Sequence, residues 1–155
     1  MGAPIKTLVV DGDAPFREAI RALLENAEGM TVVGEAQDER AAIALVRELQ
    51  PDVILLDVGT LSADGLRSVA QIRELSPESK VIMLGVRGQE RLVLDAFRKG
   101  ARGHLVKGES TLLEIVGAIR SVGRGDAILS PRMAGWILDE MAQKRRYRGG
   151  PQEAG

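Results

Sequence analysis

Three short apolar runs of this chain each end in a charged side chain. Residues 8–10 are followed by Asp11, residues 53–56 by Asp57, and residues 103–106 by Lys107. Apolar runs of this length predict buried strands. Open α/β folds bind ligands at the carboxyl ends of their parallel strands. We therefore expect Asp11, Asp57 and Lys107 to share one site. Because buried charges persist only when paired, this site could bind a ligand or hold an internal ion pair.

The elements that would position these side chains alternate between strand and helix. Strands are predicted at 5–10, 31–33, 53–56, 81–84 and 103–106. Each is followed by apolar residues at helical spacing, the first helix being capped by Asp13 and the fifth by Thr111. Five such βα units predict a parallel sheet with helices on both faces. A sixth helix begins at Ser130-Pro131 and fades into the basic run 144–148.

Length and composition describe one ordinary globular domain. The chain has 155 residues, of which 45% are hydrophobic and 28% charged, with a net charge of −1 and no cysteine. The missing cysteines exclude disulfides, thiolate metal sites and cysteine nucleophiles. Neither a signal peptide nor a membrane-spanning stretch is visible, so we expect a cytoplasmic protein without independent enzyme activity. The basic run 144–148 is expected to be a solvated helix end, and DNA binding by this chain is not predicted.

The chain resembles the receiver domains of bacterial response regulators of the NarL/FixJ (LuxR-type) family, over roughly residues 5–140. The segments that support the resemblance occur in the family's order and spacing: Leu8-Val9-Val10-Asp11, 17–24, 32–36, Pro51-Asp52-Val53-Ile54-Leu55-Leu56-Asp57, Asp64-Gly65-Leu66, 99–103 and Leu129-Ser130-Pro131. The resemblance implies a flavodoxin-like (CheY-like) five-stranded parallel sheet in the order 2-1-3-4-5. It divides the chain into a receiver domain (1–128), a connector helix (129–148) and a linker or disordered tail (149–155).

The resemblance also implies a phospho-switch. Receivers of this family accept a phosphoryl group from a partner histidine kinase, at the aspartate matched here by Asp57. An acidic pair after the first strand, of which Asp11 is the first member, holds Mg²⁺ together with a backbone carbonyl, at the position of Gly59. A lysine after the fifth strand, matched by Lys107, binds a phosphoryl oxygen. Hard oxygen ligands and charge neutralisation are what Mg²⁺ and phosphoryl transfer require.

Four positions depart from the family pattern. The second acidic position is Gly12, and the position of a phosphoryl-binding hydroxyl is Gly85. The aromatic position on the fifth strand is His104, and Leu61 replaces a proline. We therefore expect weak or absent Mg²⁺ binding, unless Asp13 serves as a substitute ligand instead of capping its helix. A phosphorylated acceptor would also lack a charge-assisted hydrogen bond worth roughly 1.5–3 kcal/mol.

Three hypotheses of function follow. In the first, the chain is an atypical receiver of a transcriptional response regulator that acts through homodimers or heterodimers with another response regulator. Asp57 and Lys107 then form an ion pair that holds the two loop ends together, with Asp11 sharing the charge of the lysine. In the second, it is a working phospho-receiver in which Asp13 completes the metal site. In the third, it is a small-molecule sensor in which Gly12 and Gly85 open a pocket beside Lys107.

The resemblance implies a dimer surface either on the face of the fourth helix, fifth strand and fifth helix, or on the first and fifth helices. His104 is expected to be half-exposed on an interaction face, and Trp136 to pack within the sixth helix or against another chain. DNA would be bound only through an output domain that is not in this chain. The linker-like residues 149–151 favour a shortened regulator over a stand-alone receiver. Apolar candidates for the part of this surface on the fifth helix are Leu112, Ile115, Val116 and Ile119, some of which must face the core.

Overall fold

The computed structural model describes residues 2–61, 65–85, 88 and 90–154, with side chains omitted at 65, 90 and 145–154. Asp64, which belongs to one of the family-like segments, lies outside the described residues. In chain order the elements are β1 (Ile5–Val10), α1 (Ala14–Glu25), β2 (Met30–Ala36), α2 (Glu39–Leu49), β3 (Val53–Asp57), the 3₁₀ turn η1 (Val58–Thr60), α3 (Gly65–Leu75), β4 (Lys80–Gly85), α4 (Glu90–Arg98), β5 (Gly103–Val106), α5 (Leu112–Gly123) and α6 (Pro131–Ala154).

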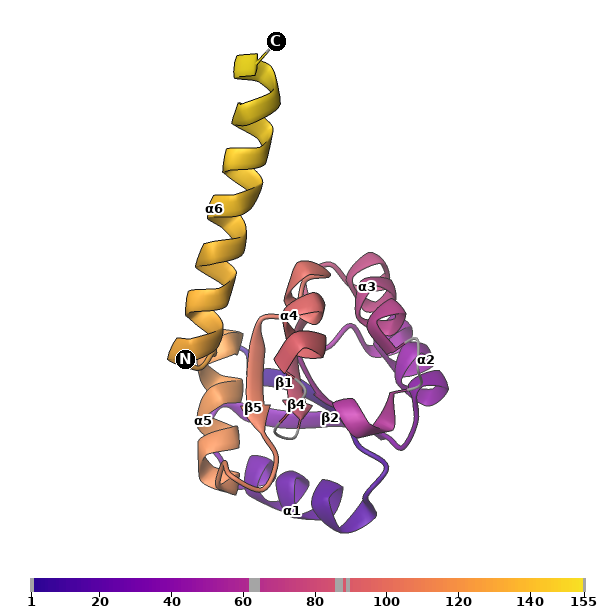
Figure 1. Ribbon diagram of the computed structural model, residues 1–155. Coiled ribbons are helices and arrows are strands. Elements are labelled where there is room, and N and C mark those ends of the chain that lie inside the picture. Colours follow the sequence, from indigo (N-terminus) through magenta and orange to yellow (C-terminus); the bar gives the residue numbers. More distant parts are fainter. Residues whose placement is uncertain (1, 62–64, 86–87, 89, 155) are drawn as a thin grey trace.

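The five strands form one parallel sheet in the order β2-β1-β3-β4-β5, as predicted. Helices α1 and α5 cover one face, and α2, α3 and α4 cover the other (Figure 1). The central strand β3 is buried from Val53 to Leu56. A strand covered on both faces must be apolar on both sides, which is why its sequence is a continuous apolar run.

Strand β2 is longer than the sequence predicts. Its predicted end lies at residue 33, whereas β2 continues to Ala36. The pairing with β1 shifts register between Thr7 and Leu8, where Thr7 pairs with Val32 and Leu8 with Gly34. An irregularity of this kind accommodates an extra residue and lets pairing resume beyond it. A glycine in the middle of the segment therefore interrupts the apolar pattern without ending the strand.

Helix α5 presents a different face to solvent from the one expected. Ile115, Val116 and Ile119 are buried, and Leu112 packs partly buried against the same core cluster. Ile115, Val116 and Ile119 are therefore the candidates that face the core, and for these three the expectation of an exposed dimer surface is wrong. The helix lies on the sheet beside α1, and this packing buries its apolar face. The exposed apolar residue of α5 is Leu113, at 73% exposure.

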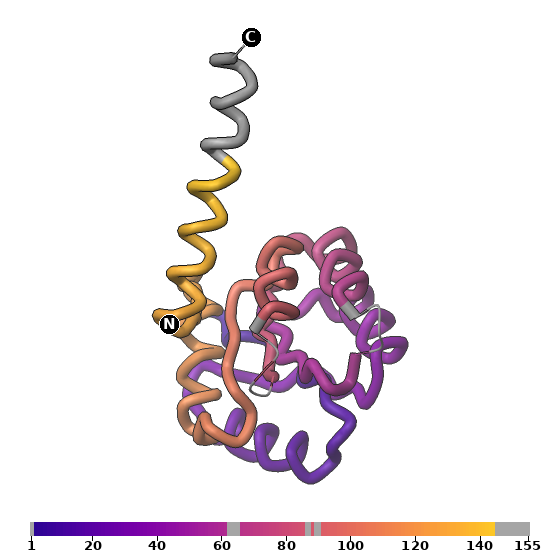
Figure 2. The backbone as a smooth tube through the Cα atoms, in the orientation of Figure 1, coloured from indigo at the N-terminus to yellow at the C-terminus, as the bar shows by residue number. Residues whose placement is uncertain are grey.

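Helix α6 leads the chain away from the sheet (Figures 1 and 2). Ser130 caps its start, because the Ser130 hydroxyl accepts a hydrogen bond from the Met133 N–H. The helical backbone continues to Ala154, through the residues for which the sequence predicts a linker. Trp136 is partly buried, with the Arg132 guanidinium 5.0 Å from its ring centre. In the part of the chain that the structure describes, no helix is long and apolar enough to cross a membrane.

Candidate functional site

The ends of β1, β3 and β5 bring the three predicted charges together at the carboxyl edge of the sheet. The Lys107 Nζ lies 2.7 Å from Asp11 Oδ2 and 3.9 Å from Asp57 Oδ1. Parallel pairing places the carboxyl ends of neighbouring strands at the same edge, which explains why residues so distant in sequence meet. The backbone N–H of Lys107 donates to the Gly85 carbonyl, so β5 holds the lysine beside the end of β4.

Lys107 is held mainly by Asp11. The Asp11 side chain is 2% exposed, whereas those of Lys107 and Asp57 are 25% and 14% exposed. A carboxylate that is this deeply buried needs a close cation. The ammonium also lies 4.4 Å from the centre of the Phe16 ring, a favourable cation–π distance. The sequence predicts Asp57 as the main partner of Lys107, with Asp11 sharing its charge. In the structure Asp11 is the closer partner of the ammonium, and Asp57 is the more distant one.

The Asp57 carboxylate has a raised pKa. Burial is the largest cause, followed by the negative charge of Asp11. Three contacts oppose this shift: a hydrogen bond from the Thr60 hydroxyl, the positive charge of Lys107 and a hydrogen bond from the Gly59 backbone. The Thr60 Oγ1 lies 2.9 Å from Asp57 Oδ2. Asp57 therefore remains a reachable carboxylate whose negative charge is only partly compensated.

Thr60 is a site residue that the sequence analysis missed. It is the last residue of η1, the turn that follows Asp57 directly, and this turn folds its hydroxyl back onto the carboxylate. The same hydroxyl oxygen accepts a hydrogen bond of 2.9 Å from the Gly12 N–H. The sequence carries one clue to its role, because Thr60 is a hydroxyl residue three positions after Asp57. It lies, however, in a segment with no strand or helix pattern that would predict where its side chain points.

The positions that depart from the family pattern have different surroundings. Gly12 is exposed, and a Cβ atom there would lie 3.6 Å from the Gln37 carbonyl and 3.7 Å from the Thr60 hydroxyl. Since both are ordinary contact distances, the backbone leaves room for a side chain. Gly85 is buried at the end of β4. Leu61 packs against the core on the side of α2 and α3.

His104 is buried, at 8% exposure, and the expectation of a half-exposed residue is wrong. The backbone N–H of His104 donates to the Ile128 carbonyl, and Gly103 forms a bridge with Ile128. The segment before α6 therefore continues the sheet beside β5 and covers the histidine. His104 also lines a cleft of about 610 Å³, which includes Glu114 of α5 and Met133 of α6.

Asp13 is the N-cap residue of α1, but its carboxylate makes no capping hydrogen bond. Its backbone N–H instead donates to Asp11 Oδ1 at 2.8 Å, and its side chain is exposed. Among the residues that the structure describes, no group of three or more His, Asp or Glu side chains is arranged to hold a metal ion. Besides the Asp57 carboxylate itself, the side-chain oxygens at this site include the Asp11 carboxylate and the Thr60 hydroxyl.

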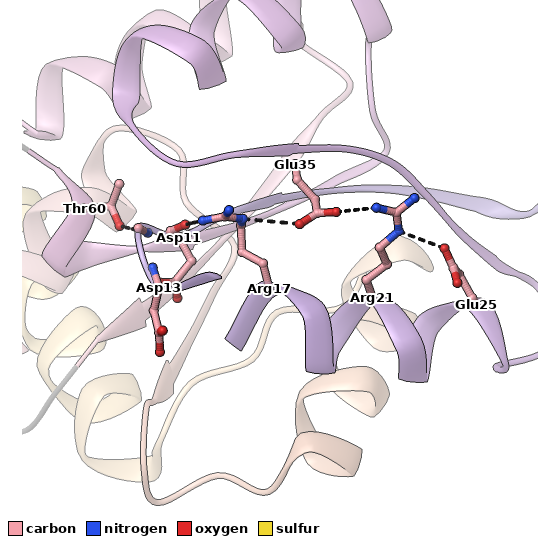
Figure 3. A network of polar contacts seen from close by, with 8 residues as sticks. Asp11, Asp13, Arg17, Arg21, Glu25, Glu35 and Thr60 are labelled. Carbon is pink, nitrogen blue, oxygen red and sulfur yellow. Dashed lines mark hydrogen bonds and ion pairs between the residues drawn. The ribbon is translucent and has the colours of Figure 1, made fainter. Parts of the chain in front are cut away.

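A chain of polar contacts connects this site with the length of α1 (Figure 3). Arg17 Nη1 donates to the Asp11 carbonyl at 2.6 Å, and Arg17 Nε lies 3.2 Å from Glu35 of β2. The other oxygen of Glu35 lies 2.7 Å from Arg21, which also pairs with Glu25 at 2.9 Å. These contacts fasten α1 to β2 and reach the backbone of the loop that carries Asp11.

The fold is that of a receiver domain. A family model of the response regulator receiver domain matches residues 7–119, and the chain belongs to this family. The predicted family is thereby confirmed. Its named relatives are response regulators and transcriptional regulatory proteins, which makes this chain a receiver domain of the two-component signalling type.

Individual relatives and solved structures show which response regulators this chain is similar to. The chain is 34% identical over 143 residues to the probable transcriptional regulatory protein NarL of Mycobacterium tuberculosis, and 36% identical over 143 residues to the response regulator GacA of Pseudomonas aeruginosa. The alignments cover 91% and 92% of this chain but only 66% of each relative. A LuxR-family response regulator from Aurantimonas superposes with a TM-score of 0.76 at 29% identity, covering 90% of this chain and 99% of that chain.

Proposed function

We propose that this chain is a receiver of a transcriptional response regulator in which contact with a second receiver, and not a Mg²⁺-dependent phosphorylation cycle, is the principal regulated step. The observation that supports this is the position of Lys107, whose ammonium lies 2.7 Å from Asp11 and 3.9 Å from Asp57. A cation of this chain thus already neutralises the carboxylate that a metal ion would need.

Competition for Asp11 makes metal binding costly. Mg²⁺ is commonly bound by one or two carboxylates with waters completing an octahedron. Here it would have to displace Lys107 from a nearly buried carboxylate, and Gly12 supplies no second acidic group. Gly85 likewise supplies no hydroxyl for a phosphoryl oxygen. The donors present therefore do not match the needs of Mg²⁺ unless the lysine gives up its partner.

A working phospho-receiver is the second candidate, and the accessibility of Asp57 favours it. The Asp57 side chain is 14% exposed, and the Lys107 ammonium lies 3.9 Å from Asp57 Oδ1, near enough to contact a phosphoryl group attached to Asp57. In this case a histidine kinase would be the partner that supplies the phosphoryl group, and Asp57 its acceptor. In both candidates, contact with DNA would belong to an output domain outside this chain.

The test is the intact mass of the protein after incubation with acetyl phosphate and Mg²⁺. Wild type is compared with Asp57→Ala, which removes the acceptor, and with Gly12→Asp, which restores a carboxylate where the backbone has room for one. We expect little or no phosphoryl adduct on wild type, a faster-forming adduct on Gly12→Asp, and none on Asp57→Ala. The sedimentation behaviour of wild type should be the same with and without acetyl phosphate.

Rapid and complete modification of wild type, at the rate found for Gly12→Asp and absent from Asp57→Ala, would refute the proposal. It would establish the phospho-receiver instead. If wild type also changed its oligomeric state upon modification, phosphorylation would be the regulated step.

A further inference from the structure

The Thr60 hydroxyl has one proton, which it donates in a hydrogen bond to Asp57. Because it donates to Asp57 Oδ2, it is left with lone pairs, and one of these accepts the Gly12 N–H. The two hydrogen bonds therefore run in one direction, from the amide through the hydroxyl to the carboxylate. Hydrogen bonds aligned in this way polarise one another, and the negative charge at their end strengthens both.

The Gly12 N–H and the Asp11 carbonyl belong to the same peptide group. This peptide is held at both ends, since its N–H donates to Thr60 and its carbonyl accepts from Arg17 Nη1 at 2.6 Å. Because a peptide group is planar and conjugated, a change in the hydrogen bonding of its N–H alters the electron density on its carbonyl oxygen. Arg17 passes the contact on to Glu35 of β2 (Figure 3).

We infer that Thr60 is a positioning residue that couples the charge of the Asp57 carboxylate, through the Asp11–Gly12 peptide, to Arg17 of α1. The coupling goes beyond the proposed function, because it operates whether that charge changes by protonation, by metal binding or by modification. Through Thr60, a change in the charge of Asp57 acts on the loop between β1 and α1.

The glycines of the site explain why Thr60 takes this part. Gly12 has no side chain to reach Asp57, and its peptide N–H donates to the Thr60 hydroxyl. Gly85 has no hydroxyl to offer from β4. The hydroxyl that contacts Asp57 comes instead from the turn that follows Asp57 itself, and its other partner is the β1–α1 loop.

The experiment compares NMR spectra at one neutral pH, with the charge of Asp57 removed by Asp57→Asn. The change is made in three backgrounds: wild type; Thr60→Val, which keeps the shape of the side chain and removes the hydroxyl; and Thr60→Ser, which restores the hydroxyl as the matched rescue. The observables are the chemical shifts of the Gly12 amide and of the Arg17 guanidinium.

In wild type and in Thr60→Ser, we expect Asp57→Asn to shift the Gly12 amide and the Arg17 guanidinium signals. In Thr60→Val, both responses should lose most of their amplitude, because the hydroxyl that joins Asp57 to the Gly12 N–H is gone. A change of packing alone would not be reversed by serine.

An unchanged Gly12 response to Asp57→Asn in a folded Thr60→Val protein would overturn the inference, as would a failure of Thr60→Ser to restore it. Should the valine variant fail to fold, Thr60→Ala provides the same test with a smaller side chain. No arm of this experiment uses acetyl phosphate or Mg²⁺, so its outcome is separate from the outcome for the proposed function.

Discussion

At the scale of single residues, the balance of charge at Asp57 sets the behaviour of the site. Two carboxylates share one ammonium, and the ammonium lies nearer to Asp11 than to Asp57. The fold therefore favours the neutral form of Asp57, and its pKa is raised mainly by burial and by Asp11. The ionised Asp57 carboxylate is, on this account, a small cost to stability at neutral pH.

We predict that Asp57→Asn raises the free energy of unfolding at pH 7. The asparagine keeps an oxygen for the Thr60 hydroxyl while removing a charge that folding disfavours. A carboxyl with a raised pKa binds more protons in the folded state, so its destabilising effect grows as pH rises through the interval between the unfolded and folded pKa values. Each unit of that interval corresponds to about 1.4 kcal/mol. The measurement is urea unfolding at pH 7 and below the unfolded pKa.

The advantage of Asp57→Asn should disappear at the acid pH, where the wild-type carboxyl is protonated in both states. Asp52→Asn is the matched control, because Asp52 is exposed and an asparagine can still accept its hydrogen bond from the Lys6 N–H. It should change stability by less than about 0.5 kcal/mol. A destabilised Asp57→Asn at pH 7 would show that Asp57 is needed as an anion by the fold.

At the scale of secondary-structure elements, close packing of α2 on β2 depends on Gly34. A Cβ atom at this position would lie 3.0 Å from Leu49 Cδ1 of α2 and 3.2 Å from Leu8 Cδ1 of β1. Both leucine side chains reach over the glycine, at the register shift between β1 and β2. The glycine that interrupts the strand pattern in the sequence is thus the one that lets the helix approach.

We predict that Gly34→Val lowers the free energy of unfolding by about 1–3 kcal/mol, because added methyl groups must push the leucines off their rotamers. Gly117→Ala is the control for glycine replacement as such. Gly117 lies in α5, where an added Cβ meets no other described atom within 4 Å, and alanine there should gain up to about 1 kcal/mol. Equilibrium denaturation measures both. A neutral Gly34→Val would mean that α2 shifts freely on the sheet.

At the scale of the whole molecule, α6 is joined to the receiver through α4. Arg98 of α4 forms ion pairs with Glu140 of α6 and with Asp95 of its own helix. Phe97 of α4 lines a small cleft with Ile137 and Met141 of α6. Much of α6 beyond this contact extends away from the sheet (Figure 1). The orientation of α6 therefore depends on a few side chains of α4, together with the buried Met133 at the start of α6.

We predict that Arg98→Ala speeds hydrogen exchange of the backbone amides around 137–141 and leaves exchange in the sheet unchanged. Arg91→Ala, which removes an exposed arginine from the same helix, is the control and should alter neither. The Arg98 guanidinium holds the pKa of Glu140 below its usual range. The ion pair is thus lost as pH falls through that lowered pKa, and the difference between Arg98→Ala and wild type should vanish in acid. Equal exchange at neutral pH would mean that the apolar contact alone holds α6.

The sequence by itself determined the fold and the location of the site. Strands buried on both faces require continuous apolar runs, and helices on a sheet require apolar residues at helical spacing, so both patterns are visible without coordinates. The same logic places Asp11, Asp57 and Lys107 at one edge, since each directly follows a predicted strand. The family resemblance drew on these same segments, and the comparisons confirm it.

Only the tertiary structure decided which of these groups touch. Lys107 lies nearer to Asp11 than to Asp57, and the Thr60 hydroxyl fills the gap between Asp57 and Gly12. Burial of His104 and of the apolar face of α5 likewise depends on neighbours far along the chain. Pairing choices of this kind turn on differences of about 1 Å between groups brought together by loops and turns. Local sequence patterns specify which residues reach an edge of the sheet, but not their distances there.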